Sequence, residues 1–497
     1  MNLICIDIGT TCCKISCISC KGIILAANAF DHNAQLPNNE IEAEQIFQSI
    51  ARELKKFIIE FNDIEAITVT SFGETVVCTG SNNKALCPSI LYFDTRTKPQ
   101  VEELCLKLGE DNIYNETGHR FGTVSTLTKL LWIRQHAPDI FEKTYYFLFV
   151  ADYILYRLGA RPFTSSSFAV RSAFLSSDCR SLWKAGLDAA GIPLSKIAPI
   201  TKPGEIVGTL SDEFCSFYKT KKPPKLISGG HDQSFATLGA GAFNPKDAAY
   251  GMGTSGSLNI VLKTYTANKN MHKYGFDCEC FLNEPSYLTF AHTPSDGKSL
   301  TWAYSILFPE TKHFEWANCE KHIKEVAEGR TDVIFLPLIN GAGTPYSEKP
   351  VSGSFFGLTD QTDKNSMLLA VLEGVAFEMK LNIELLHDIG IEIDRITVSG
   401  GGTRSEDWLQ LRANILEKAL RTCSFSNTGM LGLFAVASVT LGYFDSIRDA
   451  ILSTNPENKI VVPNTSRSKY YLEKYKLYKI DLKSFPVLGN NPRIFIE

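Results

Sequence analysis

Two short glycine–threonine turns constrain the fold of this chain most, and they lie about half the sequence apart. Residues 7–11 read Asp-Ile-Gly-Thr-Thr, and residues 251–255 read Gly-Met-Gly-Thr-Ser. A turn of this kind between two strands presents backbone N–H groups and hydroxyls, which bind anions such as phosphate. Residues 229–233, Gly-Gly-His-Asp-Gln, lie between the two turns. We therefore expect two similar lobes that face one anion, with the Asp232 carboxylate placed to activate a hydroxyl.

The first half of the chain predicts an α/β lobe. Residues 3–29 alternate apolar segments with turns, which indicates a hairpin followed by a third strand. Residues 44–60 carry apolar side chains at helical spacing. Residues 64–70 and 226–228 predict strands, and the second strand runs into two glycines. Further helices are expected at residues 126–135, at residues 152–158 and from Gln233 onwards.

The second half repeats this order of elements. Residues 248–262 predict another hairpin, residues 366–386 a long helix with one buried face, and residues 395–399 a strand. That strand runs into three consecutive glycines, and a helix is expected over residues 407–420. Because each half has a hairpin first and a strand, glycines and a helix later, the chain indicates a duplicated α/β lobe.

The length and charge of the chain limit its architecture and its partners. At 497 residues it exceeds one ordinary hydrophobic core, so about two domains are expected. We place their boundary near Asn244, where glycines and Pro245 interrupt the pattern, which gives domains 1–243 and 244–497. The 50 basic and 54 acidic residues leave a net charge of −4, which disfavours nucleic-acid binding through bulk electrostatics. The chain has no run of about 20 apolar residues, so no membrane span is predicted.

The N-terminus and the cysteines favour a cytoplasmic protein. Residues 1–7 have no basic region and an early acidic residue, so they predict a buried strand rather than a signal peptide. The 14 cysteines lie in apolar or strand-like stretches, which favours buried, reduced thiols. Cys17 with Cys20, and Cys278 with Cys280, are close enough for metal or redox pairs, but no second pair of ligands lies nearby.

Two glycine motifs imitate nucleotide-binding signatures. Residues 251–256 match G-x-G-x-x-G, but a dinucleotide-binding motif needs a helix next, and residues 257–262 predict a strand. Residues 297–299, Gly-Lys-Ser, resemble the end of a P-loop, but the first glycine of that loop would fall on His292. We therefore expect neither a Rossmann site nor a P-loop.

Phosphoryl transfer fits the first turn. This chemistry asks the protein to hold a magnesium nucleotide in line, to donate to the phosphate oxygens and to offer the acceptor a base. Thr10 and Thr11 supply hydroxyls and amides, and Lys14 adds positive charge. Asp7, at the strand end, is placed to hold Mg²⁺ through water. A carboxylate that only caps the turn is the alternative for Asp7.

Two further glycine turns extend this site. Gly253 and Thr254 would close on the same phosphates from the second lobe, and a plain tight hairpin is the alternative. Residues 400–402 are all glycine, so the backbone there can approach a flat ligand such as adenine with its ribose. The alternative is an ordinary turn between a strand and a helix.

Asp232 is the candidate base. It follows two glycines at a strand end, where a ligand can approach closely and the carboxylate can accept a hydroxyl proton. Such a base contributes about 10²–10⁴-fold to a reaction rate. A helix N-cap is the alternative, since aspartate favours that position as well. His231 and Asp232 do not indicate a hydrolase, because no serine elbow frames them and the chain has no H-E-x-x-H motif.

In their order and spacing, several segments resemble the FGGY family of carbohydrate kinases, which includes xylulokinases, gluconokinases and glycerol kinases. The resemblance runs from about residue 3 to about residue 445. It implies an α/β protein of two actin-like (ribonuclease H-like) lobes, with the active site in the interdomain cleft and ATP with Mg²⁺ bound there. The segments are residues 6–11, 92–96, 229–233, 251–255, 340–346, 353–358 and 399–402.

The resemblance also implies roles for single residues. Asp232 would be the base, and Thr10, Lys14 and Thr254 would line the phosphates. The first domain would bind the sugar and supply the base, and the second would bind the nucleotide. The residues expected near the nucleotide are Gly297, Thr301, Gly401 and Ser405.

The acceptor site departs from the better-known relatives. Glycerol kinases carry an arginine–glutamate pair where this chain has Gly73 and Glu74, and a tyrosine where it has Val124. The methionine–histidine pair usual in xylulokinases is absent here. We expect Gly73 to open space for a sugar or polyol larger than glycerol, with a pentulose favoured. The polar groups suited to its hydroxyls are Glu74, Asp94, Arg96, Asp232 and Gln233.

Two other functions share this fold class. A chaperone-like ATPase would need a peptide-binding or polymer-forming module, and only about 50 residues follow the last family motif. A catalytically silent sugar sensor would not need the intact set of Asp7, Thr10, Asp232 and Thr254. We therefore expect a kinase of a small-molecule sugar or polyol, without a nucleic-acid or membrane partner. The sequence leaves room for a homodimer.

Overall fold

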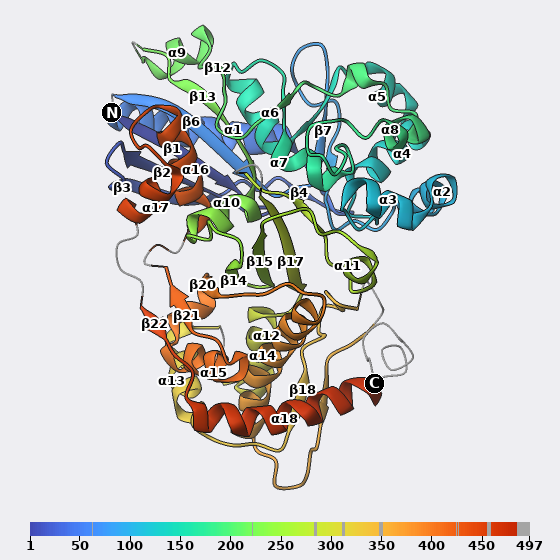
Figure 1. Ribbon diagram of the computed structural model, residues 1–497. Coiled ribbons are helices and arrows are strands. Elements are labelled where there is room, and N and C mark those ends of the chain that lie inside the picture. Colours follow the sequence, from blue (N-terminus) through green and yellow to red (C-terminus); the bar gives the residue numbers. More distant parts are fainter. Residues whose placement is uncertain are drawn as a thin grey trace.

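The computed structural model describes residues 1–61, 63–220, 222–282, 286–310, 314–346, 351–423, 425, 427–454 and 459–484. The chain forms two α/β lobes, one above the other in Figure 1, and each is built around its own mixed sheet. This arrangement confirms the duplicated α/β architecture. The position of the domain boundary near residue 244 stays a prediction.

A six-stranded sheet forms the first lobe, in the order β12-β13-β6-β1-β2-β3. Strand β1 (Asn2–Ile8) pairs antiparallel with β2 (Cys12–Ser19) and parallel with β6 (Ile64–Ser71). Strand β6 pairs parallel with β13 (Lys225–His231). The carboxyl ends of β1, β6 and β13 therefore meet at one edge, where ligands bind in open α/β sheets. The outer strands are β3 (Ile24–Asp31) and β12 (Ile206–Thr209).

A seven-stranded sheet forms the second lobe, in the order β16-β17-β15-β14-β20-β21-β22. Strand β14 (Asp247–Met252) makes an antiparallel hairpin with β15 (Gly256–Leu262) and pairs parallel with β20 (Arg395–Ser399). The same hairpin-and-parallel-strand order thus builds both sheets. The other strands are β16 (Glu279–Cys280), β17 (Tyr287–Thr293), β21 (Leu420–Thr422) and β22 (Ile460–Val461).

Helices cover the sheets where the periodicity predicts them. Helix α1 (Ala43–Glu60) buries Ile46, Ile50 and Leu54 on one face. Helix α14 (Lys364–Asp388) is 25 residues long and buried along most of its length, because it packs against neighbours on several sides. In the described ranges no helix has both the length and the apolar character that crossing a lipid bilayer would require.

The shorter elements complete the two lobes. The helices are α2 (Lys98–Leu108), α3 (Glu110–Thr117), α4 (Thr126–His136), α5 (Pro138–Lys143), α6 (Val150–Leu158), α7 (Ser166–Ala169), α8 (Lys184–Ala190), α9 (Asp212–Tyr218), α11 (Lys269–Lys273) and α13 (Trp316–Val326). The 3₁₀ helices are η1 (Val170–Ser172), η2 (Leu194–Lys196) and η3 (Gly401–Arg404). The small strands are β4 (Gln35–Leu36), β5 (Glu40–Ile41), β7 (Val76–Thr79), β8 (Ser89–Ile90), β9 (Tyr146–Phe149), β10 (Thr164–Ser165), β11 (Ile200–Thr201), β18 (Ile334–Leu336) and β19 (Ser354–Phe356).

The chain returns to the first lobe near its C-terminal end. Helices α16 (Thr428–Thr440) and α17 (Ile447–Thr454), drawn in red, lie beside β1 and β2 in Figure 1. Phe434 of α16 belongs to the same apolar cluster as Leu3 of β1. The C-terminal half of the chain therefore contributes to the hydrophobic cores of both lobes.

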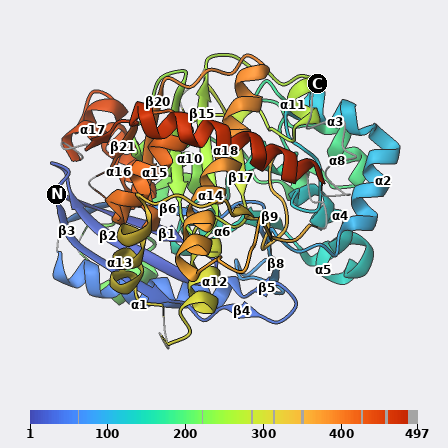
Figure 2. The same ribbon diagram turned by 90° about the horizontal axis from the view of Figure 1, so that it is seen from below.

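Helix α18 (Thr465–Ser484) crosses the second lobe, as Figure 2 shows from below. The hydroxyl of Tyr475 donates to Glu384 of α14 at 2.8 Å, and the hydroxyl of Tyr478 donates to buried Glu378. The last described helix is therefore part of the second lobe and does not stand apart as a binding module.

One predicted helix is too long. The helix expected over residues 407–420 is α15 (Glu406–Leu416), and Leu420 begins β21 instead. Glu417 takes a left-handed conformation with φ of 54°, and such a residue ends a right-handed helix. The helices expected at residues 44–60, 126–135, 152–158 and 366–386 and from Gln233, and the predicted strands, are confirmed within a few residues.

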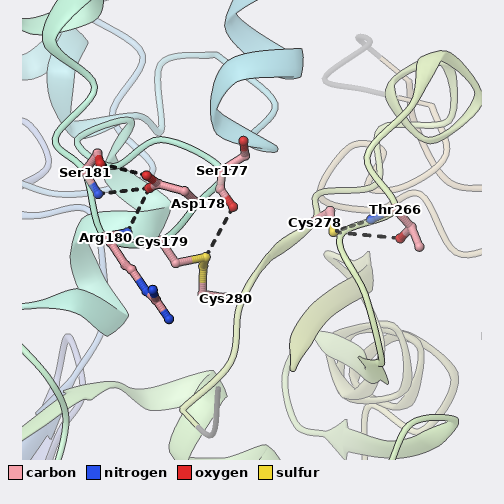
Figure 3. Close-up of a disulfide and its surroundings, with 8 residues drawn as sticks. All are labelled: Ser177, Asp178, Cys179, Arg180, Ser181, Thr266, Cys278 and Cys280. Atoms are coloured by element: carbon pink, nitrogen blue, oxygen red, sulfur yellow. Dashed lines mark hydrogen bonds between the residues drawn. A yellow bond between two sulfur atoms is a disulfide. The ribbon is translucent and has the colours of Figure 1, made fainter. Parts of the chain in front are cut away.

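A disulfide joins Cys179 to Cys280, so the expectation that the cysteines are reduced is wrong for this pair. Their Cα atoms are 6.0 Å apart, within the usual range for a disulfide. Cys179 lies in a loop after η1 of the first lobe, and Cys280 lies on β16 of the second sheet, so the bond ties the lobes together (Figure 3). Cys278 does not share this bond, and its Sγ accepts from the Thr266 N–H at 3.4 Å instead.

Candidate active site between the lobes

A cavity of about 560 Å³ lies where segments of both lobes meet. Its lining is mixed in polarity and contains several charged side chains. Its charged and aromatic lining includes Glu74, Arg171 and Asp232 from the first lobe, and Asp277 and Phe290 from the second.

Asp232 stands at the junction of β13 and α10 (Asp232–Gly239), which places its carboxyl group in this cavity. Oδ1 accepts the Gln233 N–H at 2.7 Å and lies 3.3 Å from Nε2 of His231. Oδ2 has no hydrogen-bond partner in the part of the chain that the structure describes. One oxygen is thus held by the protein, and the other is available to an acceptor hydroxyl. His231, rather than Asp232, occupies the N-cap position of α10, which removes the alternative of a helix cap.

The electrostatics of the site suit a base. Burial, followed by the charges of Asp7 and Glu74, raises the pKa of Asp232 from 3.8 to about 7, although the Gln233 N–H and Arg171 oppose the rise. A general base works best when its pKa lies near the operating pH. Asp232 is therefore able to accept a proton close to neutrality.

Gly73 does not open the cavity as we expected. A Cβ atom added there would lie 2.6 Å from Cδ2 of His231, so the imidazole ring already fills that space. Glycine at this position instead lets the ring pack beside Asp232. Burial and the Arg171 charge keep the pKa of His231 well below its usual range, so the ring is neutral.

The first phosphate-type turn has Asp7 at its edge. The turn closes through the Gly9 N–H, which donates to the Cys12 carbonyl at 2.9 Å, and Thr10 and Thr11 stand at its tip. Burial raises the pKa of Asp7, although Lys14, with Nζ 3.8 Å from Oδ2, favours the ionised carboxylate.

The second turn is joined to the start of α12 (Gly297–Leu307). The carbonyls of Gly253 and Thr254 accept the N–H groups of Gly297 and Lys298 at 2.9 and 3.0 Å. A Cβ atom on Gly297 would lie 2.6 Å from the Gly253 carbonyl oxygen, so glycine is needed for this close packing. The structure thus brings Gly253, Thr254 and Gly297 together, and Thr301 follows one helical turn later.

A buried polar cluster fixes this second turn from behind. Arg412 Nη2 contacts Asp296 Oδ1 at 2.5 Å, and the Tyr250 hydroxyl donates to Asp296 Oδ2 at 2.7 Å. The Arg412 and Asp296 side chains are 0% and 1% exposed. In the sequence, the signal for this cluster is Arg412, which stands on an otherwise apolar helix face. A fully buried arginine needs a partner, so an arginine in such a place indicates a buried ion pair.

The three consecutive glycines have different environments. Gly400 has a φ of 95° and lies against Met252, because an added Cβ would come within 2.7 Å of the Met252 carbonyl oxygen. Gly401 borders open space, with nothing within 4 Å of an added Cβ. Ser405 is buried, and its hydroxyl caps α15 by accepting the Trp408 N–H at 3.3 Å.

The expected acceptor residues fall into two groups. Glu74 and Gln233 line the cavity together with Asp232. Asp94 and Arg96 do not line it. Arg96 Nε donates to Asp94 at 2.9 Å. Arg96 Nη1 reaches Glu40 at 2.7 Å, so the pair braces the loop behind the cavity.

Several cavity residues were missed by reasoning from sequence. Arg171 contacts Glu74 and Glu279, and Asp277 accepts the Arg120 N–H at 2.6 Å. The only available signal was a pair of acidic residues in an apolar stretch, Asp277 and Glu279, with one residue between them. Among the described residues no group of three or more His, Cys, Asp or Glu is arranged to hold a metal ion.

Two α/β lobes, a glycine–threonine turn in each and a buried carboxylate between them are the features expected of a phosphotransferase. The sequence model of the FGGY family of carbohydrate kinases matches in both of its parts: the N-terminal domain over residues 2–239 and the C-terminal domain over residues 248–441. The chain therefore belongs to the FGGY family of carbohydrate kinases, and it is a sugar kinase.

Named relatives agree with this assignment. The xylulose kinase of Staphylococcus xylosus is 25% identical over 481 residues, covering 95% of this chain and 98% of that protein. The crystal structure of ligand-bound xylulose kinase from Lactobacillus acidophilus matches with a TM-score of 0.90 at 22% identity, covering 98% and 99% of the two chains. Gluconate kinase from the same species matches with a TM-score of 0.89 at 22% identity and the same coverage. These structures share the actin-like fold.

Proposed function

We propose that this protein transfers the γ-phosphoryl group of ATP to a hydroxyl of a sugar or polyol, with Asp232 as the general base and a pentulose as the favoured acceptor. The observation that carries the proposal is the Asp232 carboxyl group, which lies in a cavity shared by both lobes with a pKa near 7 and one free oxygen. The likeness to a xylulose kinase along nearly the whole chain supports a pentulose.

The reaction follows from this geometry. The acceptor hydroxyl donates to Oδ2 of Asp232 and loses its proton to that oxygen as its own oxygen attacks the γ-phosphorus. The new O–P bond forms while the bond to the ADP oxygen breaks. Lobe closure keeps water out of the cavity and so limits wasteful hydrolysis.

The nucleotide phosphates bind between the two turns. Thr10, Thr11 and Lys14 contact them from the first lobe, and Gly253 and Thr254 contact them from the second. The residues assigned to the rest of the nucleotide are Gly297, Thr301, Gly401 and Ser405. The open space beside Gly401 fits a flat base, whereas Ser405 serves through the helix that it caps.

Asp7 suits a magnesium ion. Its carboxylate is largely buried, and Lys14, the cation that the described residues place beside it, is 3.8 Å away, too far for a direct hydrogen bond, so the carboxylate can still bind a hydrated cation. Mg²⁺ keeps several waters and is typically held by one or two carboxylates together with phosphate oxygens. When bound, it would neutralise charge on the transferred phosphoryl group.

A coupled ADP-release assay with a panel of pentuloses, hexuloses, polyols and aldonates tests the proposal. We expect a neutral pentulose to raise ADP release well above the background hydrolysis. If ATP binds but none of the acceptors raises ADP release, the kinase assignment of this site is wrong. A chaperone-like ATPase gains no support, because α18 packs on the second lobe instead of forming a separate module.

A further inference from the structure

A line of charged side chains crosses from the first lobe to the second beside the cavity. Arg171, on η1, donates from Nε to Glu74 Oε1 at 2.7 Å and from Nη1 to Glu279 Oε2 at 2.9 Å. Glu74 follows β6 of the first sheet, and Glu279 lies on β16 of the second. The guanidinium also stacks 4.5 Å from the ring of Phe290. Arg171 therefore has a fixed position that depends on both lobes.

Arg171 and Glu74 each have one polar atom left to bind a ligand. Nη2 of Arg171 and Oε2 of Glu74 make no hydrogen bond to any residue in the described ranges, and both side chains line the cavity. The side chains are only 12% and 4% exposed and both line the cavity, so a ligand in the cavity can reach these atoms. Buried polar atoms are normally satisfied, and an adjacent donor and acceptor suit two neighbouring hydroxyls of a sugar.

The charges around the cavity are already matched. Arg171 faces two carboxylates, those of Glu74 and Glu279. Although burial opposes it, the contact with His119 and the charge of Arg120 hold the pKa of Asp277 below its usual value, so Arg120 shares its charge with that carboxylate. Lys98, at the start of α2, also lines the cavity, but its side chain is exposed, so water and salt screen its charge. A ligand carboxylate beside Arg171 would thus meet acidic groups rather than a buried, unmatched cation.

We infer that Arg171, together with Glu74, reads a pair of neighbouring hydroxyls, and that the site selects a neutral polyhydroxy acceptor over an aldonate. This inference rests on the proposed function and narrows its substrate class. Arg171 acts as a specificity residue, and Glu279 acts through it, since Glu279 is not among the residues that line the cavity.

The charge of Glu279 offers a sharp test. Glu279→Gln keeps an oxygen that accepts from Nη1 but removes one of the two carboxylates that face Arg171, so the surroundings of the guanidinium become less negative and repel an anionic ligand less. We expect this variant to bind D-gluconate about tenfold more tightly while neutral sugars change little. Arg171→Lys loses the forked geometry and should weaken binding of neutral sugars about tenfold. Glu40→Gln is the matched control, because it removes a carboxylate paired to Arg96 outside the cavity and should leave both preferences unchanged.

The experiment measures binding of D-xylulose, D-ribulose, xylitol and D-gluconate by calorimetry without nucleotide, alongside turnover with ATP. Thermal unfolding and ATP binding establish that each variant is folded. The inference is supported if the wild type binds a neutral probe preferentially, if Arg171→Lys loses this preference, and if Glu279→Gln shifts it towards gluconate. The inference is overturned if the wild type binds gluconate as tightly as every neutral probe, or if both variants keep the wild-type preferences. Selective binding without turnover would leave the inference standing and count against the kinase mechanism instead.

Discussion

Nε2 of His231 lies 3.3 Å from Oδ1 of Asp232 at the end of β13. Because burial and the Arg171 charge keep the imidazole neutral, the ring lies beside this oxygen without placing a positive charge next to the carboxylate. The Gln233 N–H donates to the same oxygen. The protein thus orients the carboxylate through one oxygen and leaves the other to the acceptor.

The pKa of Asp232 predicts the pH dependence of the reaction. The base must be ionised, and burial followed by the charge of Asp7 raises its pKa to about 7. We expect kcat/KM to reach a plateau above about pH 7 and to fall about tenfold per pH unit below it. A flat profile of kcat/KM across neutrality would contradict this assignment.

The same shift predicts a stability effect. Folding raises this pKa, so Asp232 stabilises the folded state at pH values below its ordinary pKa of 3.8. This contribution is lost as the pH rises through about 7. Asp232→Asn should therefore be more stable than the wild type above neutral pH, by about 1 kcal/mol after allowance for solvent screening. Denaturant unfolding at several pH values measures this. Asp94→Asn is the control, and it should destabilise because Asp94 is paired with Arg96.

Gly73→Ala should impair catalysis through His231. The added Cβ would lie 2.6 Å from Cδ2 of the ring, so the imidazole must move and the Asp232 carboxylate loses the ring that packs beside it. We expect kcat to fall about tenfold or more while ATP binding stays close to that of the wild type. Equal kcat in Gly73→Ala and the wild type would show that the position of His231 does not matter.

Reduction of the Cys179–Cys280 disulfide should lower stability. The bond closes a loop with a sequence separation of 101 residues and joins the two lobes. Removal of a disulfide that closes a loop of this size lowers the free energy of unfolding by about 2–4 kcal/mol. Denaturant unfolding with and without a reductant checks this. Cys179→Ser should lose its response to the reductant, and Cys278→Ser should keep it.

The sequence predicted the sheets and the central carboxylate because their signals are local. The hairpin of β14 and β15 follows from alternating apolar residues around a Gly-Thr turn, and Asp232 follows from two glycines at a strand end. The end of α15 was misplaced, since no local signal required Glu417 to adopt a left-handed conformation.

The parts of the site that the sequence did not predict depend on distant partners. Arg171 meets Glu74 and Glu279, which lie 97 and 108 residues away in the chain. Gly73 was interpreted as open space, because nothing in the sequence places the ring of His231 against it. Asp94 and Arg96 were grouped with the acceptor residues, yet they bind each other and Glu40.

The most direct test of the central claim is the single-turnover rate of Asp232→Asn with ATP and the best neutral acceptor. This substitution keeps the shape of the side chain and removes its ability to take a proton. We predict a loss of about 10²–10⁴-fold in the rate of phosphoryl transfer, with ATP and sugar binding retained. A rate within a few-fold of the wild type would contradict the assignment of Asp232 as the base.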